Sequence, residues 1–491
     1  MGTATTSVAE HAVADNQGDG ASSAERPSGI GPALRARLRG LDRYDGLMAL
    51  IVLAGLVLRV AYVVANQHTP VTGDGIDYYG SALLLGDGDG FIASTIVRAS
   101  GGFLAVPAAE HPPAWALTLT PLAVVGVERI LWFQIATCVV GSATVGVVGL
   151  TGRRLAGRRC GLIAAAIAAF YPNLWIYERV LQCETLAMLL TALCLYVAYG
   201  LWQRPRRRGV IILGLLVGAL AMTRPEAVLL YPLLVVPMVL LLRTPDRATR
   251  VRWLAIGTAM VMLPILPWVV YNTSRFDQPV ALTTNVGATL AASNCDEAYD
   301  GPMVGWWSYD CLADATSVAR QRMPAYGAAD LDVELRRIAV DYIGDHLDRK
   351  PAVMLFREGR VWGVYQPFQQ TKLDSIGGPK QDVTRYGLYA YWALAPAAIA
   401  GAVILRRRRI PLTPVLAVVA TVAISAGLTI GQTRYRALAE VAVVILAAVA
   451  LDALVRRRGT LPSDGEQPRG DRPGETGHDA VGARGAGNGR S

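Results

Sequence analysis

Charged residues are scarce in this chain of 491 residues. Asp, Glu, Lys and Arg make up 17% of it and hydrophobic residues 53%, whereas an average soluble domain carries about 25% charge. The scarcity argues against a soluble enzyme. The net charge of +9 would elsewhere suggest nucleic acid, but these basic residues cluster in short loops between apolar runs, where they set membrane orientation. We therefore expect no nucleic-acid partner.

Other features are missing as well. No cleavable signal peptide is evident, and no solenoid-type repeat is present. What remains is a series of apolar runs that approach the roughly 20 residues needed to cross a bilayer. The sequence thus predicts an all-α polytopic membrane protein with about ten or more transmembrane helices, at 47–66, 130–150, 161–177, 186–202, 209–222, 227–242, 254–270, 389–405, 411–430 and 438–454.

The basic clusters predict the membrane topology. Placing them all in the cytoplasm leaves both termini inside and requires that the Pro-rich segment 111–127 lie at the outer interface without crossing. The basic clusters occupy 35–43, 153–159, 204–208, 243–252, 406–409 and 456–458. The expected organisation is a disordered cytoplasmic arm (1–44), a transmembrane module (45–270) with a first outer loop (67–129), an extracytoplasmic loop domain (271–388), C-terminal transmembrane helices (389–455) and a disordered cytoplasmic tail (456–491).

Two carboxylates follow the first apolar run directly, in TGDGIDYYGSALLLG. The spacing of three residues puts Asp74 and Asp77 on one side of a helical turn. Asp74 is also a good helix N-cap, and that interpretation stays open beside a functional one. Asp87 and Asp89, in GDGDG, are typical of turns, since the remaining ligands of a calcium loop are missing.

Further ionisable residues fall on the same expected outer face. Glu184 is predicted inside a span, where a carboxylate needs a partner, while Glu178 and Arg179 are interpreted as flanking charges. Arg224 either pairs with Glu226 or faces an anionic ligand. Arg434 and Arg436, in GQTRYR, occur where the positive-inside rule disfavours Arg, and phosphate binding would explain them. Glu110 and His111 precede Pro-Pro; this histidine is either an ordinary interfacial residue or an anion ligand.

The six cysteines divide into two groups. Cys138, Cys160, Cys183 and Cys194 lie in or beside apolar runs and are interpreted as small apolar residues. Cys295 and Cys311 both lie in the expected outer loop, where an oxidising exterior favours a disulfide. A metal site is the weaker alternative, because no second Cys or His pair accompanies them.

These segments, taken in order over about residues 45–455, resemble the GT-C-fold membrane glycosyltransferases, in particular the protein O-mannosyltransferase and aminoarabinose-transferase group. The resemblance rests on Asp74 four residues before Tyr78, followed by a small-residue helix. It also rests on EHPPAWALTLTPL with His111 where the group commonly has Lys, on YPNLWIYERVLQCETLAMLL, on GLLVGALAMTRPEAVLLYPLL, on PWVVYNTSRFDQPVALTTNVG and on GQTRYRALAE. The cysteine-bearing loop resembles an actinobacterial subset.

The resemblance implies transfer of a sugar from a polyprenyl-phosphate donor to an acceptor hydroxyl on a lipid, glycan or protein, with inversion, at the extracytoplasmic face of the cell membrane. It implies Asp74 as base, with Asp77 and Glu184 as further catalytic residues. His111, Arg224, Arg434 and Arg436 would bind the donor phosphate, and Tyr78, Glu110 and Tyr435 would contact substrate. No cofactor is certain; a divalent cation held with the help of Asp77 and Glu184 is one expectation.

A multi-span transporter or lipid-linked sugar flippase is the main alternative, because many spans and interfacial charges fit it equally. Transporters often show repeated halves with broken helices, and no such repeat is found here. A scaffold that only displays the outer loop is a further alternative. It would not need Asp74, Glu184 and Arg434 to converge, and it fails if Asp74, Glu110, Glu184 and Arg434 line one cavity.

Overall fold

The computed structural model describes residues 42–102, 104–242, 246–323 and 327–458. The expected disordered tails therefore lie almost wholly outside the described residues. Within these ranges every regular element is a helix, apart from an isolated bridge between Ile92 and Pro107. The order is α2 (Arg43–Ala65), α3 (Asp74–Asp87), α4 (Ser94–Ala99), α5 (Ala114–Val124), α6 (Ile130–Ala156), α7 (Arg158–Phe170), η1 (Pro172–Leu174), α8 (Glu184–Gln203), α9 (Arg207–Ala221), η2 (Pro225–Leu229), η3 (Tyr231–Val235), α10 (Val236–Leu241), α11 (Arg247–Thr273), α12 (Val286–Ser293), α13 (Asp296–Tyr299), α14 (Tyr309–Arg322), α15 (Ala328–Asp345), α16 (Lys350–Val361), α17 (Pro367–Asp374), η4 (Ser375–Gly377), α18 (Gln381–Arg407), α19 (Thr413–Leu428), η5 (Thr433–Arg436) and α20 (Ala437–Arg458).

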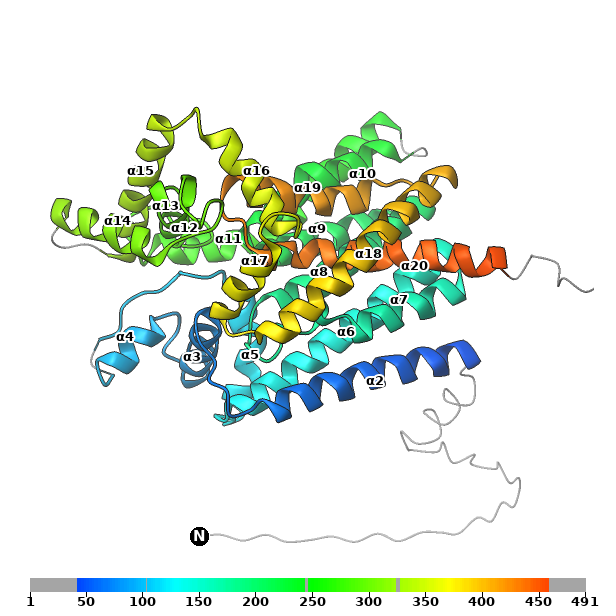
Figure 1. Ribbon diagram of the computed structural model, residues 1–491, viewed down its shortest axis with the longest axis horizontal. Coiled ribbons are helices and arrows are strands. Elements are labelled where there is room, and N and C mark those ends of the chain that lie inside the picture. The colour runs from blue at the N-terminus through cyan, green and yellow to red at the C-terminus, as the bar shows by residue number, and fades with distance from the viewer. Residues whose placement is uncertain (1–41, 103, 243–245, 324–326, 459–491) are drawn as a thin grey trace, which may run out of the picture.

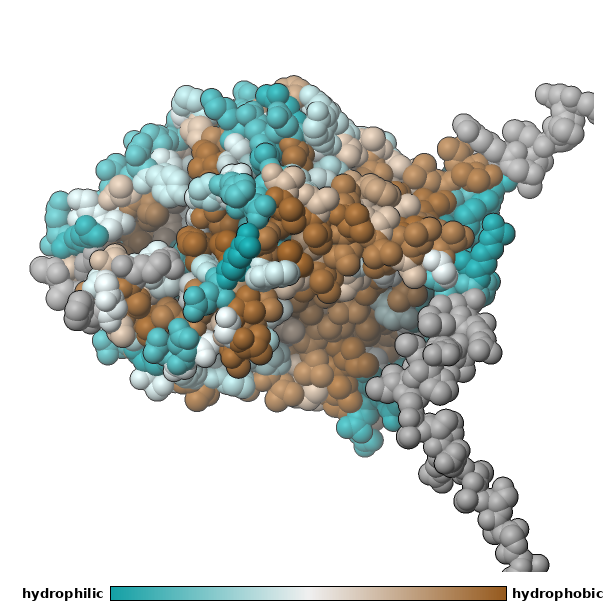
Figure 2. All heavy atoms as spheres, turned by 90° about the horizontal axis from the view of Figure 1, so that it is seen from below, coloured by the Kyte–Doolittle hydropathy of each residue, from teal (hydrophilic) through white to brown (hydrophobic). Residues whose placement is uncertain are grey.

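Long apolar helices form the body of the molecule. Among the described residues, six helices are long and apolar enough to cross a membrane: α2, α6, α8, α11, α18 and the helix running from Thr433 to Arg456. Helices α2, α6, α18 and α20 follow the long axis (Figure 1), and an apolar belt separates two polar ends (Figure 2). The chain is thus a multi-pass membrane protein.

The number of spans differs from the expectation of ten. The remaining predicted spans correspond to shorter helices, such as α7 with 13 residues, α9 with 15 and α19 with 16. The segment Pro225–Leu241 is also apolar but is broken into 3-10, π and α turns. Helix α5 has only 11 residues, which is too short to span a bilayer. The count of ten stays a prediction.

One end of the molecule collects the basic loops. Arg158 pairs with Asp42 (2.6 Å) and Arg159 with Asp452 (2.7 Å), which ties the start of α2, the α6–α7 junction and the end of α20 together. The end of α8 joins them, because Gln203 donates to the carbonyl of Arg154. Several basic clusters therefore share one end, as the predicted threading requires.

The opposite end is capped by short helices of the first and second large loops (Figure 1). The described residues of the segment 271–388 are mostly helical. Its α12, α14 and α15 pack around an alanine-rich core of Ala291, Ala315, Ala319, Leu335 and Ala339. A disulfide joins Cys295 at the start of α13 to Cys311 in the first turn of α14, with Cα atoms 6.2 Å apart. This capped end holds the site described next.

Candidate functional site

Asp74 stands at the first turn of α3, yet it does not cap that helix. The N-cap position is Gly73, and no side-chain cap bond is present. The carboxylate instead accepts a hydrogen bond from Nη2 of Arg434, 2.7 Å away and 360 residues later in the chain. A side chain at Gly75 would place Cβ 1.9 Å from the carbonyl oxygen of Val180. This close packing fixes the start of α3, and with it Asp74, against the segment that leads into α8.

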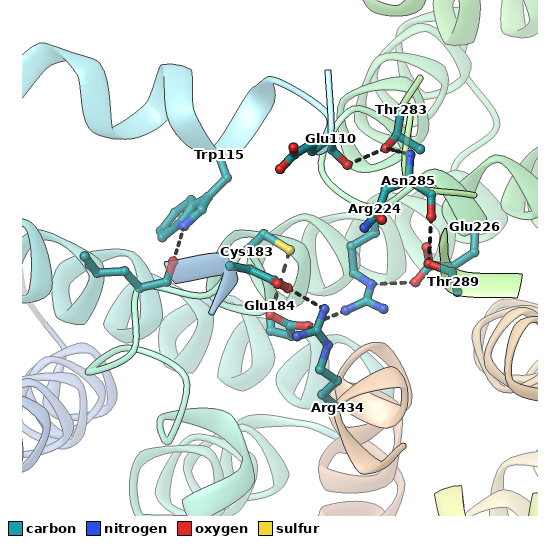
Figure 3. Close-up of polar contacts among 12 residues, drawn as sticks. Glu110, Trp115, Cys183, Glu184, Arg224, Glu226, Thr283, Asn285, Thr289 and Arg434 are labelled. Atoms are coloured by element: carbon teal, nitrogen blue, oxygen red, sulfur yellow. Dashed lines mark hydrogen bonds and ion pairs between the residues drawn. The ribbon is translucent and has the colours of Figure 1, made fainter. Parts of the chain in front are cut away.

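Glu184 binds two arginines at once (Figure 3). It is the first residue of α8, not an interior one as the sequence suggested, and its side chain is completely buried. Its carboxylate pairs with Nη1 of Arg224 and lies 3.5 Å from Nε of Arg434. The expectation that a buried carboxylate needs a partner is met twice over. Glu184 therefore holds the two guanidinium groups in fixed positions.

Arg224 pairs with Glu226, the first of the two interpretations of its sequence context, while its binding of an anionic ligand stays a prediction. Its Nε pairs with Glu226 at 2.5 Å, while Nη1 reaches Glu184. Its guanidinium carbon also lies 4.8 Å from the ring centre of Tyr435. Arg224 is thus clamped from three sides, so its position needs no ligand to fix it.

The charge state of Asp74 follows from its neighbours. Burial alone would raise the pKa of this carboxyl, but the positive charges of Arg434 and His111, with the hydrogen bond from Arg434, outweigh burial and hold the pKa well below its usual range. Asp74 is therefore a carboxylate at any physiological pH. Its side chain remains 30% exposed and that of Arg434 27%, so both reach open space.

That space consists of two cavities that share a wall. The first, about 250 Å³, is lined by Tyr78, Glu110, His111, Arg224 and Arg434, and reaches Ser425 and Thr429 at the end of α19. The second, about 330 Å³, is lined by Asp74, Gln182 and Gln432. Arg434, Tyr435, Asn285 and Thr289 line both. The first cavity thus contains two arginines beside the carboxylates of Glu110 and Glu226, the second contains Asp74, and Arg434 lines both. The expected single cavity is not formed, because Asp74 and Glu110 line different cavities and Glu184 lines neither.

Asp77 belongs to a different group from Asp74. The ligand atoms of Asp77, Glu110 and His111 all lie within 4.8 Å of one another, and the His111 ring packs on Tyr78 with centroids 4.7 Å apart. Two carboxylates and an imidazole are a donor set that fits Mn²⁺ or Zn²⁺. The sequence paired Asp77 with Glu184 for a cation, whereas the fold groups it with Glu110 and His111.

Two sequence interpretations are altered by burial. Glu178 and Arg179 are not flanking charges at a surface: they are 1% and 0% exposed, and Glu178 pairs with Arg59 of α2 at 2.9 Å. The lone Arg59 within an apolar run was the signal that could have predicted this pair. Arg436 is fully buried and pairs with Glu440 at 2.7 Å; it lines neither of these two cavities, although it lines a further one with Arg434.

Sequence reasoning also missed several lining residues. Asn285 is the residue before α12, and Thr289 lies in the first turn of that helix. Both line the two cavities, and no local pattern distinguishes them from ordinary loop residues. Trp306, Trp307 and Tyr309 line the second cavity. Their clustering between the two disulfide cysteines was a visible signal.

Comparison with solved structures defines the class of fold. The chain shares its fold with the archaeal oligosaccharyltransferase AglB of Archaeoglobus fulgidus, solved with an inhibitory peptide and a dolichol-phosphate, at a TM-score of 0.50 and 12% identity over 86% of this chain and 52% of that one. This is the expected GT-C fold. The chain spans about half the length of that enzyme.

Sequence comparison adds a family for part of the chain. Residues 110–271 match the model of the dolichyl-phosphate-mannose-protein mannosyltransferase family. ArnT of Cupriavidus metallidurans, solved with undecaprenyl phosphate, overlaps at a TM-score of 0.38 and 14% identity over 85% of this chain and 81% of that one. No protein of curated function matches the chain significantly.

Proposed function

We propose that this protein is a glycosyltransferase that moves a sugar from a polyprenyl-phosphate donor to an acceptor hydroxyl. One observation carries the proposal: Arg434 stands between a cavity that also contains Arg224 and a cavity that contains Asp74. The matched mannosyltransferase family model and the fold shared with an enzyme that binds dolichol-phosphate support it. The positive-inside rule would put the basic end in the cytoplasm and the site on the extracytoplasmic face.

The donor phosphate belongs in the first cavity. A guanidinium offers five N–H donors in a planar fork, and the contacts of Arg224 and Arg434 with carboxylates occupy only part of them. His111 lines the same cavity. The cavity reaches Ser425 and Thr429 at the end of the apolar helix α19, and we place the polyprenyl chain along this helix.

Asp74 then acts on the other side of the reacting carbon. The acceptor oxygen forms its bond to the anomeric carbon while the bond from that carbon to the phosphate oxygen breaks, and the electron pair leaves with polyprenyl phosphate. The acceptor proton passes to Asp74. Attack opposite the phosphate inverts the anomeric configuration.

The low pKa of Asp74 makes it a weak base while Arg434 is bound to it. A donor phosphate that draws the Arg434 guanidinium toward itself would weaken this pairing and raise the pKa of Asp74 toward its ordinary value. Base strength would thus increase when donor is present. A divalent cation, if one is used, would be held by Asp77, Glu110 and His111 and would supply additional positive charge for the leaving phosphate.

The test is transfer of radiolabelled sugar from polyprenyl-phosphate donors in membranes that contain wild type, Asp74→Asn or Asp87→Asn. Asp87 is exposed at the far end of α3 and serves as the matched control. We expect Asp74→Asn to lose transfer by about 10²–10⁴-fold at equal protein level, while Asp87→Asn transfers normally. Equal transfer by both variants would remove Asp74 as the base. Movement of the donor across the membrane without transfer would establish the flippase alternative.

A further inference from the structure

Three aromatic residues form one wall of the cavity that contains Asp74. Trp306, Trp307 and Tyr309 all line it, and we call them the aromatic shelf. Trp306 is 2% exposed and forms the base; Trp307 stacks near it at 6.1 Å between centroids and 28° between planes. Tyr309 meets Trp307 edge-on at 4.3 Å and is 64% exposed. The shelf therefore offers Trp307 and Tyr309 to a ligand over a buried support.

The shelf is held rigidly relative to the site. Gly305 has a φ of +78°, and a Cβ there would lie 2.9 Å from the amide nitrogen of Arg357, so only glycine lets the loop pack on α16. The carbonyl of Gly305 accepts a hydrogen bond from the amide of Gly431 at 2.9 Å. Because Gly305 precedes Trp306 and Gly431 is three residues before Arg434, this bond joins the loop of the shelf to the segment that leads to the arginine. The disulfide Cys295–Cys311 closes the loop on its other side.

The chemistry of this wall suits a saccharide. The faces of aromatic rings are electron-rich and attract the C–H face of a sugar ring, while its hydroxyls need hydrogen-bonding groups. Asn285, Thr289, Gln182 and Gln432 supply these around the same cavity. The indole Nε1 of Trp307 is buried without an acceptor among the described residues, so the contribution of Trp307 to the wall is argued from its ring and not from its N–H. Tyr309 is close enough to Asp74 for that carboxylate to help raise its pKa, after desolvation.

An interfacial aromatic belt would be the ordinary explanation for exposed Trp and Tyr in a membrane protein. Two observations disfavour it. The aromatic shelf lines a cavity together with Asp74 instead of covering the apolar belt, and its loop is anchored by hydrogen bonds to both Ala298 and Gly431.

We propose that the aromatic shelf binds a sugar ring of the acceptor, and hence that the acceptor is a glycan and not a hydroxyl of a peptide or a simple lipid. The inference rests on the proposed function. The donor phosphate is assigned to the cavity of Arg224 and His111, so the donor sugar lies near the shared wall at Arg434. The space beyond Asp74, where the shelf lies, is then on the acceptor side of the reacting carbon.

The experiment uses the full chain in lipid nanodiscs: wild type, Trp307→Ala, Trp307→Phe and Trp132→Ala. Trp132 is 53% exposed on α6 and is the matched control. Binding of a mannobiose, an arabinofuranose disaccharide and a Thr-containing peptide is measured by saturation-transfer NMR without donor. The KM values for acceptor and for donor, and the slow release of free sugar from donor alone, are measured separately.

We expect a disaccharide to bind wild type, and Trp307→Ala to weaken its binding and raise the acceptor KM about tenfold. Trp307→Phe should stay within about threefold, because it keeps the ring but loses the N–H. In Trp307→Ala the acceptor KM should rise more than the donor KM, and in Trp132→Ala both KM values and free-sugar release should match wild type. A rise in donor KM alone would assign the shelf to the donor sugar and overturn the inference. Two further results would overturn it: wild type that binds the peptide but neither disaccharide, and disaccharide binding that is unchanged in Trp307→Ala. Disaccharide binding in a protein that never turns over donor would instead contradict the proposed function and leave the shelf as a saccharide site.

Discussion

Arg434 and Arg436 are two residues apart in η5 and have opposite surroundings. Arg434 is 27% exposed between two cavities and touches Asp74 and Glu184 only in part. Arg436 is completely buried, donates to Glu440 and to the carbonyl of Val361, and stacks on Tyr391. The sequence analysis predicted the same role, donor phosphate binding, for both arginines. Arg434 is a candidate ligand-binding residue because it is partly exposed and lines the cavities that contain Arg224 and Asp74. Arg436 is a structural residue because it is fully buried and its charge is paired with Glu440, although its Nη2 has no partner among the described residues and it lines a further cavity with Arg434.

Substitution of Arg436, the structural arginine, should have the largest effect on stability. Glu440 also accepts hydrogen bonds from Tyr171 and Asn173, so Arg436→Ala would leave a carboxylate buried with no cation. We expect a loss of about 3–5 kcal/mol in the free energy of unfolding, seen as a lower melting temperature and lower membrane yield. The double variant Arg436→Met/Glu440→Leu removes both charges and should recover most of this loss. If the double variant is no more stable than Arg436→Ala, the two residues do not act as a neutralising pair.

Substitution of Arg434, the partly exposed arginine, should change activity and leave stability nearly intact. Arg434→Ala removes one of the two arginines in the first cavity, the one that also contains Arg224. We expect kcat/KM for donor to fall by about 10²-fold, since one charge-assisted contact contributes about 1.5–3 kcal/mol. Arg434→Lys should recover little of it, because an ammonium lacks the planar fork. The comparison is made at equal melting temperature. A donor KM unchanged in Arg434→Ala would contradict the assignment of this cavity to phosphate.

Much of this contrast was beyond what local sequence can predict. Long apolar runs and basic clusters predicted a polytopic helical protein with one basic end, because hydropathy and charge act locally along the chain. The convergence of Asp74, Glu184 and Arg434 was a hypothesis that depended on an assumed topology, and the fold brings them together. Whether Arg434 or Arg436 is the buried one depends on Glu440, Tyr171 and Tyr391, which reach the site from three helical segments. No spacing within GQTRYR encodes that choice.

Removal of the Cys295–Cys311 disulfide tests how the segment 271–388 supports the site around Arg434. Replacing both Cys295 and Cys311 by Ser opens a short closed loop, which should lower the unfolding free energy of this region by about 2–3 kcal/mol. Because the Gly305–Gly431 hydrogen bond links the aromatic shelf to the segment before Arg434, we expect the acceptor KM to rise severalfold with donor KM unchanged. Steady-state kinetics of the double variant, and of wild type with and without a mild reductant, measure this. Equal acceptor KM values would show that the helices position the shelf without the disulfide.

The smallest expected effect concerns Asp374, which accepts a hydrogen bond from Thr433, the neighbour of Arg434. Burial raises the pKa of Asp374 to about 6, against the opposing hydrogen bonds of Thr433 and Gln370 and the charge of Arg436. The folded protein thus binds a proton more tightly than the unfolded chain, so this stabilising contribution is complete below the ordinary aspartate pKa and is lost as the pH rises through about 6.

Asp374→Asn mimics the protonated form and should therefore be more stable than wild type at pH 7.5, by about 1 kcal/mol. Its advantage should shrink as the pH falls through 6 and disappear near pH 4. Melting temperatures of both proteins across this range measure the difference, with Asp382→Asn at the exposed start of α18 as control. A constant difference at every pH would mean that the amide changes packing and not charge. A less stable variant at pH 7.5 would show that Arg436 keeps Asp374 ionised, and the charge of Arg436 would then extend into the site in spite of its pairing with Glu440.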